Sequence, residues 1–196
     1  MTDKKIIAIT DEIIELYEKH GSNEYAGEKV SQLEHMVQAA QLAKQSGYDD
    51  EIVLAAFLHD IGHICAANYI TGDMNGFGVM NHEKIGANFL RKRGFSERVA
   101  RLVENHVSAK RYLTFKYPEY YEGLSEASKK TLEFQGGRMN YDEAMLFEQD
   151  DLFEEYIEMR RWDEQAKEEN QPLPPINYFK QLMKTYLQRQ YSFNQI

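Results

Sequence analysis

The sequence predicts an all-α protein, and three observations support this prediction. Apolar residues recur at helical spacing between glycine-containing breaks, no segment reads convincingly as a strand, and three of the four prolines are confined to residues 172–175. No internal repeat or low-complexity segment is present, so we expect a single domain over residues 1–196. We expect helices, in chain order, over residues 3–20, 29–46, 50–66, 82–93, 96–109, 125–134, 141–168 and 176–190.

Four of these helices carry a histidine on the face that also carries their apolar residues. This shared face is what the periodicity of each helix predicts to be buried. Two boundaries are also marked by capping residues, because Ser96 and Ser125 are favourable N-caps and Gly94 follows the end of the preceding helix. The histidines align as follows: His35 with Ala39 and Leu42, His59 with Ile52, Ala55 and Ala56, His82 with Ile85, Gly86 and Phe89, and His106 with Val99, Leu102 and Val103.

The expected helix 141–168 is rich in acidic residues, which we interpret as a solvent-exposed face. Asp163 differs from the others because it follows Leu152, Tyr156 and Met159 at helical spacing and so falls on the apolar stripe. A buried carboxylate requires a cation. Either Arg160, one turn earlier on the helix, or a bound metal ion would meet that requirement.

The composition excludes several classes of protein. The chain has 196 residues, of which 42% are hydrophobic, and 32 acidic against 23 basic residues give a net charge of −9. This balance argues against binding to nucleic acid or to an anionic membrane surface. No apolar stretch approaches the ~20 residues of a membrane helix, and the N-terminus does not read as a signal peptide. The single Cys65 suits a reducing compartment, so we expect a cytoplasmic protein. No feature of the sequence indicates an obligate protein partner.

The histidines and inward acids together predict a metal site. One inward histidine is usually a hydrogen-bonded core residue, but several are costly to desolvate unless something binds them. Neutral imidazole nitrogens that converge are metal ligands. In the segment 57–63, FLHDIGH, the adjacent His59 and Asp60 project roughly 100° apart on a helix, so one ion could accept both. The second carboxylate oxygen of Asp60 could reach another ion.

Residues at these positions resemble those of the HD-domain superfamily, an all-α bundle in which the pattern H…HD…D binds a divalent metal. His82 and His106 are additional inward histidines, and they imply a second metal ion with Asp60 between the two. Nitrogen-rich ligation suits iron or zinc better than magnesium. The four positions that match the pattern are His35, His59, Asp60 and Asp163.

The chain is most similar to the mixed-valent di-iron oxygenase branch of this superfamily, and within it to the 2-amino-1-hydroxyethylphosphonate dioxygenases. The resemblance implies two iron ions, one Fe(II) and one Fe(III), with O2 as co-substrate and a small organophosphonate as substrate. It implies cleavage of the C–P bond of a 1-hydroxyphosphonate such as (R)-2-amino-1-hydroxyethylphosphonate, or its N-methylated analogue, to phosphate and glycine or a betaine. The similar segments are residues 24–28, 32–35, 59–63, 125–137 and 160–163.

The resemblance also assigns the substrate phosphonate to basic and hydroxyl groups near the metals. Helical spacing agrees for Lys110, four residues after His106, and for Arg160, three residues before Asp163. The alternative is that Lys110 and Arg160 form ordinary surface ion pairs. The full set of assigned substrate residues is Glu28, His63, Lys110, Ser128, Thr131, Gln135 and Arg160.

Two residues have catalytic roles by resemblance, Tyr25 and Lys110. A loop containing Tyr25 and Glu28 is expected to close over the metals, where Tyr25 caps one iron and Glu28 contacts the substrate ammonium group. The alternative places Glu28 in the first turn of the next helix, where the helix dipole favours it, with Tyr25 packed on the surface.

Two other functions remain open from the sequence. The first is a metal-dependent phosphohydrolase of the wider HD superfamily, which uses a metal-bound water and acts on a phosphate ester. His82 and His106 argue against a simple mononuclear form of it. The second is a non-catalytic ligand-binding module, and the presence of all six candidate ligands argues against a degenerate site.

Overall fold

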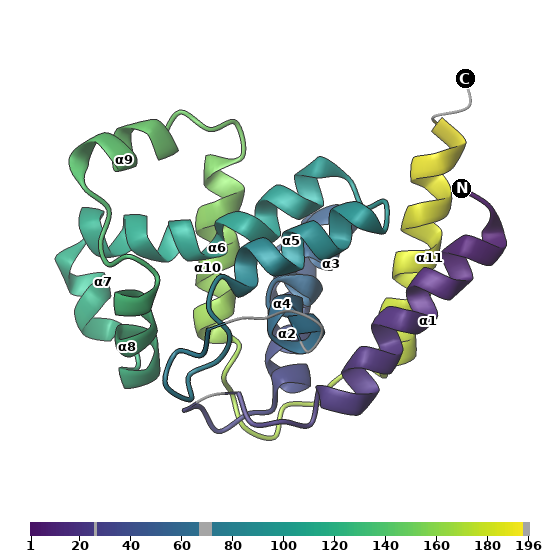
Figure 1. Ribbon diagram of the computed structural model, residues 1–196, viewed down its shortest axis with the longest axis horizontal. Helices are drawn as coiled ribbons and strands as arrows, with labels where there is room; N and C mark the ends of the chain where they lie inside the picture. Colours follow the sequence, from purple (N-terminus) through teal and green to yellow (C-terminus); the bar gives the residue numbers. More distant parts are fainter. Residues whose placement is uncertain (26, 67–71, 194–196) are drawn as a thin grey trace.

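The computed structural model describes residues 1–25, 27–66 and 72–193, and these residues form helices and no strand (Figure 1). The predicted all-α class is confirmed. The helices are α1 (Asp3–His20), α2 (Gln32–Gln45), α3 (Asp50–Leu58), α4 (Ile61–Cys65), α5 (His82–Lys92), α6 (Glu97–Lys116), α7 (Pro118–Gly123), α8 (Glu126–Phe134), α9 (Tyr141–Phe147), α10 (Phe153–Gln165) and α11 (Ile176–Phe193).

Helix α6 forms the centre of the bundle. It packs against α3, α5 and α10, and α2 packs against both α3 and α10. Helices α1 and α11 lie side by side at one edge, and α7, α8 and α9 lie at the opposite edge (Figure 1). The ring of Phe57 joins α3 to the α1–α11 pair, because it stacks on Phe179 at 4.0 Å while its carbonyl accepts the Tyr17 hydroxyl at 2.7 Å.

Polar caps fix where most of these helices begin. A side-chain oxygen at the N-cap accepts one of the N–H groups that the first turn leaves unpaired. The two N-caps expected from the sequence act in this way: Ser96 accepts the N–H of Val99, and Ser125 accepts the N–H of Ser128. At α2, Ser31 and Glu34 form a reciprocal capping box, so the helix begins at Gln32 rather than at residue 29.

The expected helix 50–66 is interrupted at the His59–Asp60 pair. Asp60 has φ −102° and ψ 13°, outside helical geometry, and separates α3 from α4. The sequence is apolar on both sides of this break, so its periodicity gave no sign of an interruption. The break frees Asp60 from the helical projection that we expected for it.

Helix α6 continues to Lys116, seven residues beyond the expected end at residue 109. It stops where Pro118 forces Tyr117 into an extended conformation, with φ −129° and ψ 100°. The short helix α7 then starts with Pro118 in its first turn, a position that proline tolerates well. We had not expected α7.

The expected helix 141–168 is two helices, α9 and α10, joined by an acidic turn. Arg101 of α6 holds this turn, because its Nη2 atom lies 2.6 Å from Asp150 and 2.5 Å from Asp151. The same Oδ1 atom of Asp150 also accepts the N–H of Leu152. Part of the acidic segment therefore ends one helix rather than covering the exposed face of a long one.

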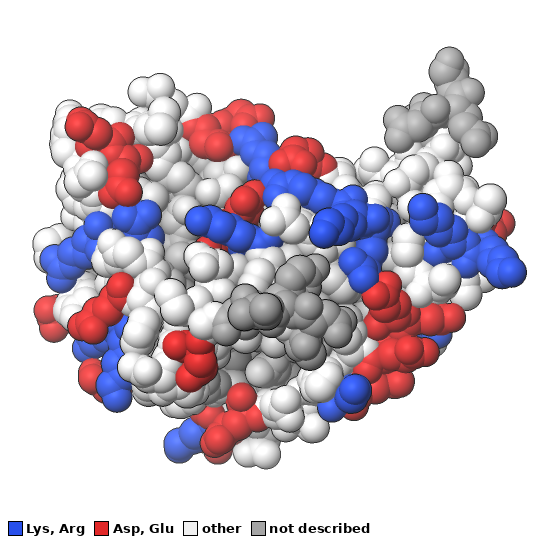
Figure 2. Space-filling view, in the orientation of Figure 1, with Lys and Arg blue, Asp and Glu red and all other residues white. Residues whose placement is uncertain are grey.

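Basic and acidic side chains are interspersed on the face of the molecule in Figure 2. Several form ion pairs between helices, such as Arg91 with Glu97 and Glu104, and Arg93 with Glu12. Among the described residues, no helix combines the length and the apolar character needed to cross a bilayer.

Candidate metal centre

The six candidate ligands come together at the centre of the bundle. His35 projects from α2, His59 and Asp60 from the break between α3 and α4, His82 from the start of α5, His106 from α6 and Asp163 from α10. All six side chains are buried, with at most 3% of each residue exposed. The predicted inward direction of Asp163 and of the four histidines is therefore correct.

Gly62 allows this convergence. A Cβ atom at this position would lie 1.9 Å from the carbonyl oxygen of His82, so any side chain would push α4 away from the start of α5. The glycine of the HDIGH segment thus brings the main chain of His82 close to Asp60.

Each of the four histidine rings is oriented by a hydrogen bond from Nδ1 to a main-chain carbonyl oxygen. Because a carbonyl only accepts, Nδ1 carries the proton, and in the neutral ring Nε2 presents a lone pair. Such bonds are typical of histidines that ligate metals. The bonds are His35 to Ala166 at 2.9 Å, His59 to Ala56 at 2.8 Å, His82 to Val79 at 3.2 Å and His106 to Val103 at 2.7 Å.

The Nε2 atoms meet in two pairs. His35 and His59 have their Nε2 atoms 3.1 Å apart, and His82 and His106 have theirs 3.1 Å apart. Two lone pairs at this distance repel each other unless a proton or a metal ion lies between them. Metal–nitrogen bonds of ~2 Å would fit both pairs.

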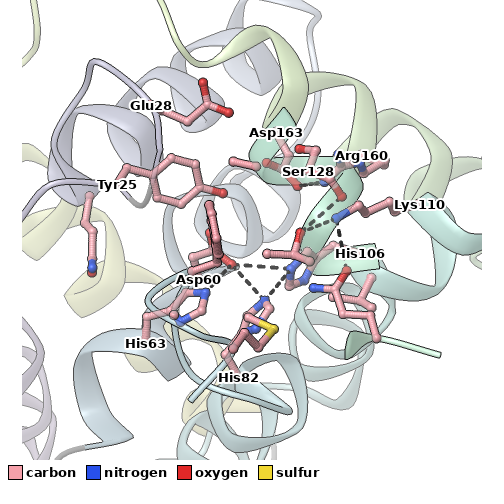
Figure 3. Close-up of a pocket in the computed structure, with 18 of the residues that line it drawn as sticks. Tyr25, Glu28, Asp60, His63, His82, His106, Lys110, Ser128, Arg160 and Asp163 are labelled. Atoms are coloured by element: carbon pink, nitrogen blue, oxygen red, sulfur yellow. Dashed lines mark hydrogen bonds and ion pairs between the residues drawn. The ribbon is translucent and has the colours of Figure 1, made fainter. Parts of the chain in front are cut away.

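Asp60 lies between the two pairs and presents one oxygen to each. Its Oδ1 atom is 3.2 Å from His82 Nε2 and 3.3 Å from His106 Nε2, and its Oδ2 atom is 3.4 Å from His59 Nε2 (Figure 3). The Oδ1 atom is buried and accepts no hydrogen bond. Asp163 completes the first group, with Oδ1 3.3 Å from His35 Nε2. These donors fit two metal ions that share Asp60.

The electrostatics of the centre favour positive charge. Burial alone would raise the pKa of Asp60, but the histidines around it hold that pKa well below its usual value. Burial would lower the pKa of His59, but Asp60 raises it to about 9. The centre therefore favours a proton or a metal ion at His59 Nε2.

His63 differs from the four histidines in its hydrogen bonding. Its Nδ1 atom accepts the N–H of Val79 at 3.0 Å, so its proton is on Nε2. Burial, and then the nearby His82, lowers the pKa of His63 to about 3, and the two rings stack at 3.9 Å. His63, which the resemblance assigned to the basic and hydroxyl groups that bind the phosphonate, is thus a neutral donor, and this tautomer presents no lone pair at Nε2 to a metal ion.

A pocket opens directly from the centre and is lined by every substrate residue that we expected from the sequence. Lys110 extends into it from α6, and its Nζ atom donates to Thr131 at 2.7 Å and Gln135 at 3.0 Å (Figure 3). Burial, and then Arg160, lowers the pKa of Lys110 well below its usual value. No ion pair joins Lys110 to any acidic residue in the described part of the chain. The expected residues on the pocket wall are Tyr25, Glu28, His63, Lys110, Ser128, Thr131, Gln135 and Arg160.

Arg160 is bound more tightly than Lys110. It is 4% exposed, pairs with Asp163 on the same helix and with Glu164 at 2.7 Å, and donates to the Tyr120 hydroxyl at 2.9 Å. Of the two cations that the sequence offered for Asp163, Arg160 is in direct contact with it. Neither Lys110 nor Arg160 forms an ordinary surface ion pair.

Tyr25 and Glu28 lie in the loop before α2, which begins only at Gln32. Glu28 therefore lies in the loop, and the alternative that placed it in the first turn of the helix is wrong. The Tyr25 ring stacks on His35 at 3.9 Å, and Figure 3 shows it pointing into the pocket. Glu28 accepts from Lys167 and Ser125, each at 2.7 Å.

The residues of the site that were not expected from the sequence include Lys167 and Tyr120. Lys167 lines the pocket and lies four residues after Asp163, the same spacing that indicated Lys110, so this signal was available. Tyr120 supports Arg160 from α7, a helix that the sequence did not predict, and no signal pointed to it.

Comparison with known proteins agrees with this geometry. The model of the HD domain family matches residues 32–147, which include five of the six candidate ligands and leave out Asp163. The chain belongs to the HD-domain family. An uncharacterized protein of Acanthamoeba polyphaga mimivirus is 45% identical over 94% of this chain and 84% of its own length.

Two relatives of this HD-domain chain are named as dioxygenases. The [1-hydroxy-2-(trimethylamino)ethyl]phosphonate dioxygenase (glycine-betaine-forming) of Leisingera caerulea is 37% identical over 84% of this chain and 83% of its own length. The hydroxymethylphosphonate dioxygenase of Gimesia maris is 38% identical over 85% of this chain and 82% of its own length. The expectation of an HD-domain oxygenase is confirmed, and the family implies that the chain binds metal.

Proposed function

We propose that this protein is a di-iron dioxygenase that cleaves the C–P bond of a small 1-hydroxyphosphonate. The observation that carries the proposal is the pair of histidine couples on either side of Asp60, with the buried amine of Lys110 in the adjoining pocket. The names of the two dioxygenase relatives support the phosphonate substrate, since both name a phosphonate with a hydroxyl group on its carbon chain.

One iron would be held by His35, His59 and Asp163, and the other by His82 and His106. Asp60 would contribute one oxygen to each, and these donors leave positions open for substrate and O2. Bound iron would supply the redox chemistry that O2 requires. The protein's own contribution is to hold the Nε2 lone pairs inward through the Nδ1 bonds to main-chain carbonyls.

The phosphonate group would bind at the cationic wall of the pocket. Lys110 uses two of its three N–H bonds for Thr131 and Gln135, and the third is available to a phosphonate oxygen. Arg160 lies on the same wall, so a dianion would meet two buried cationic groups. Because the described partners of Lys110, Thr131 and Gln135, are neutral, phosphonate binding would stabilise its charged form.

His63 and Tyr25 would complete the reacting end of the pocket. The Nε2–H of His63 is a neutral donor one turn from Asp60, and it suits a phosphonate or hydroxyl oxygen. Tyr25 covers His35 with its ring, which excludes water from that face until substrate and O2 enter. Burial, together with the charge of Asp60, raises the pKa of Tyr25 well above its usual value, so its phenol is neutral.

The overall reaction balances without a further reductant. The substrate R–CH(OH)–PO3²⁻ and O2 give R–COO⁻, HPO4²⁻ and H⁺. The C–H and C–P bonds break, the carbon is oxidised to a carboxylate, and O2 is the oxidant. The role of the protein residues is to hold the C–H bond near the metals and to balance the phosphonate charge.

The test is phosphate release from iron-loaded protein with a panel of 1-hydroxyphosphonates, with and without O2. We expect one phosphate per O2 consumed and no release under argon. Release of phosphate from a phosphate ester under argon, with none from any hydroxyphosphonate in O2, would overturn the proposal in favour of a phosphohydrolase. No reaction with either class would leave only a ligand-binding role.

A further inference from the structure

Two ion pairs join the loop before α2 to the residues that follow α10. In the inner pair, Lys167 Nζ lies 2.7 Å from Glu28 Oε1, and the two side chains are 18% and 14% exposed. In the outer pair, Lys29 Nζ lies 3.0 Å from Glu169 Oε1, and the side chains are 81% and 51% exposed. Only the inner pair lines the pocket.

The position of Lys167 is fixed by its neighbours in the chain. The carbonyl oxygen of Ala166 accepts the Nδ1–H of His35 at 2.9 Å. The main chain of Glu168 is bound on both its N–H and its C=O by the side chain of Gln38, at 3.1 and 2.9 Å. The backbone on either side of Lys167 is thus tied to α2, and the ammonium group is held opposite the loop.

Glu28 therefore has its charge balanced within the protein. Its Oε1 atom accepts from both Lys167 and Ser125. Figure 3 shows the Glu28 carboxylate directed away from Asp60. A substrate ammonium group that approached Glu28 would have to displace Lys167 or share the carboxylate with it. The basic side chains of Lys110 and Arg160 line the same pocket.

We propose that Lys167 determines substrate specificity by neutralising Glu28, so that the pocket favours 1-hydroxyphosphonates without a cationic nitrogen. This inference rests on the proposed function and identifies its substrate class more closely. By resemblance alone, Glu28 was expected to contact a substrate ammonium group. The ion pair gives that carboxylate a resident partner and acts against cationic substrates by repulsion.

Equilibrium binding tests the inference without turnover. The probes are ethylphosphonate and 2-aminoethylphosphonate, which share a carbon skeleton and differ in the ammonium group. Iron-loaded wild-type protein should bind ethylphosphonate more tightly. Lys167→Met should shift the ratio of the two dissociation constants by about tenfold toward the amino compound, equivalent to one removed charge interaction of ~1.4 kcal/mol. Lys167→Arg should keep the wild-type ratio.

Two variants separate the pocket charge from loop anchoring. Lys29→Met removes the outer pair between the same two segments, and it should leave the ratio unchanged. Glu28→Gln combined with Lys167→Met should lose the gain for the amino compound, because no carboxylate remains to bind it. The same ratios should appear in kcat/KM for 1-hydroxyethylphosphonate and (R)-2-amino-1-hydroxyethylphosphonate.

An unchanged binding ratio in Lys167→Met, or the same shift in Lys29→Met, would overturn the inference even in an active enzyme. A shifted ratio in a protein that never releases phosphate would overturn the proposed function and leave the role of Lys167 intact. Failure of every variant to bind either phosphonate would overturn both.

Discussion

The Nε2 atoms of His35 and His59 lie 3.1 Å apart, while the Nδ1–H of each ring is bound to a main-chain carbonyl oxygen. With Nδ1 bonded in this way, the two Nε2 atoms need a shared proton or a metal ion between them, and the raised pKa of His59 reflects the same demand for positive charge. His82 and His106 repeat the relationship on the other side of Asp60. This arrangement is unfavourable in a buried core without a shared proton or a bound cation, and it is the basis on which we propose a pair of metal sites.

Asp60→Asn should remove most of the metal from both sites, because both proposed ions share its carboxylate. Asp163→Asn should remove metal from the His35–His59 site alone, so that about one ion per chain remains. Metal content after iron loading, measured by mass spectrometry against protein concentration, distinguishes these outcomes. Retention of two ions by Asp60→Asn would exclude the bridge.

Lys110→Met and Arg160→Met should have opposite effects on the stability of the metal-free protein. Lys110 is a buried cation with neutral partners, so a methionine of similar shape should leave the free energy of unfolding within about 1 kcal/mol of wild type, or raise it. Arg160→Met removes the ion-pair partner of the buried Asp163 carboxylate. It should lower the free energy of unfolding by about 3–5 kcal/mol. Chemical denaturation measures both.

Both substitutions should weaken phosphonate binding, since each removes a cation from the pocket wall. Lys116→Met is the matched control for Lys110→Met: it lies on the same helix, but its ion pair with Glu148 is on the surface. Equal losses of unfolding free energy in the Lys110 and Arg160 variants would contradict this account, in which Lys110 has neutral partners and Arg160 has carboxylate partners.

The effect of Lys110→Met on stability should depend on pH. Burial lowers the pKa of Lys110 in the folded state, so between that pKa and the unfolded value of 10.5 the unfolded chain binds more protons. The destabilisation due to Lys110 is complete below the folded pKa and disappears as the pH rises to about 10.5. The stability gained by Lys110→Met over wild type should therefore shrink between neutral pH and pH 10, as thermal melts of both proteins can show. A gain that grows with pH would contradict the lowered pKa.

Much of the candidate site could be predicted from the sequence because its ligands obey helical spacing. His35, His106 and Asp163 each share a face with apolar neighbours, and a buried face is what periodicity reports. Lys110 and Arg160 were assigned to the pocket by resemblance, and their helical spacing from His106 and Asp163 agreed with that assignment. The inward direction of each side chain could be inferred without knowing which helices pack against each other.

The interruptions of helices could not be predicted in this way. The break at Asp60 lies within an apolar segment, two residues before the point where Gly62 packs against the main chain of His82. The turn between α9 and α10 depends on Arg101, about fifty residues earlier in the chain. The pairing of Glu28 with Lys167 likewise joins distant segments, and local patterns carry no information about such contacts.

Anomalous diffraction at the iron edge from crystals of the iron-loaded protein is the most direct measurement. It should reveal one peak beside His35, His59 and Asp163, a second beside His82 and His106, and the carboxylate of Asp60 between them. A single peak with His82 and His106 turned away from it, or peaks at other places in the molecule, would contradict the two-metal centre.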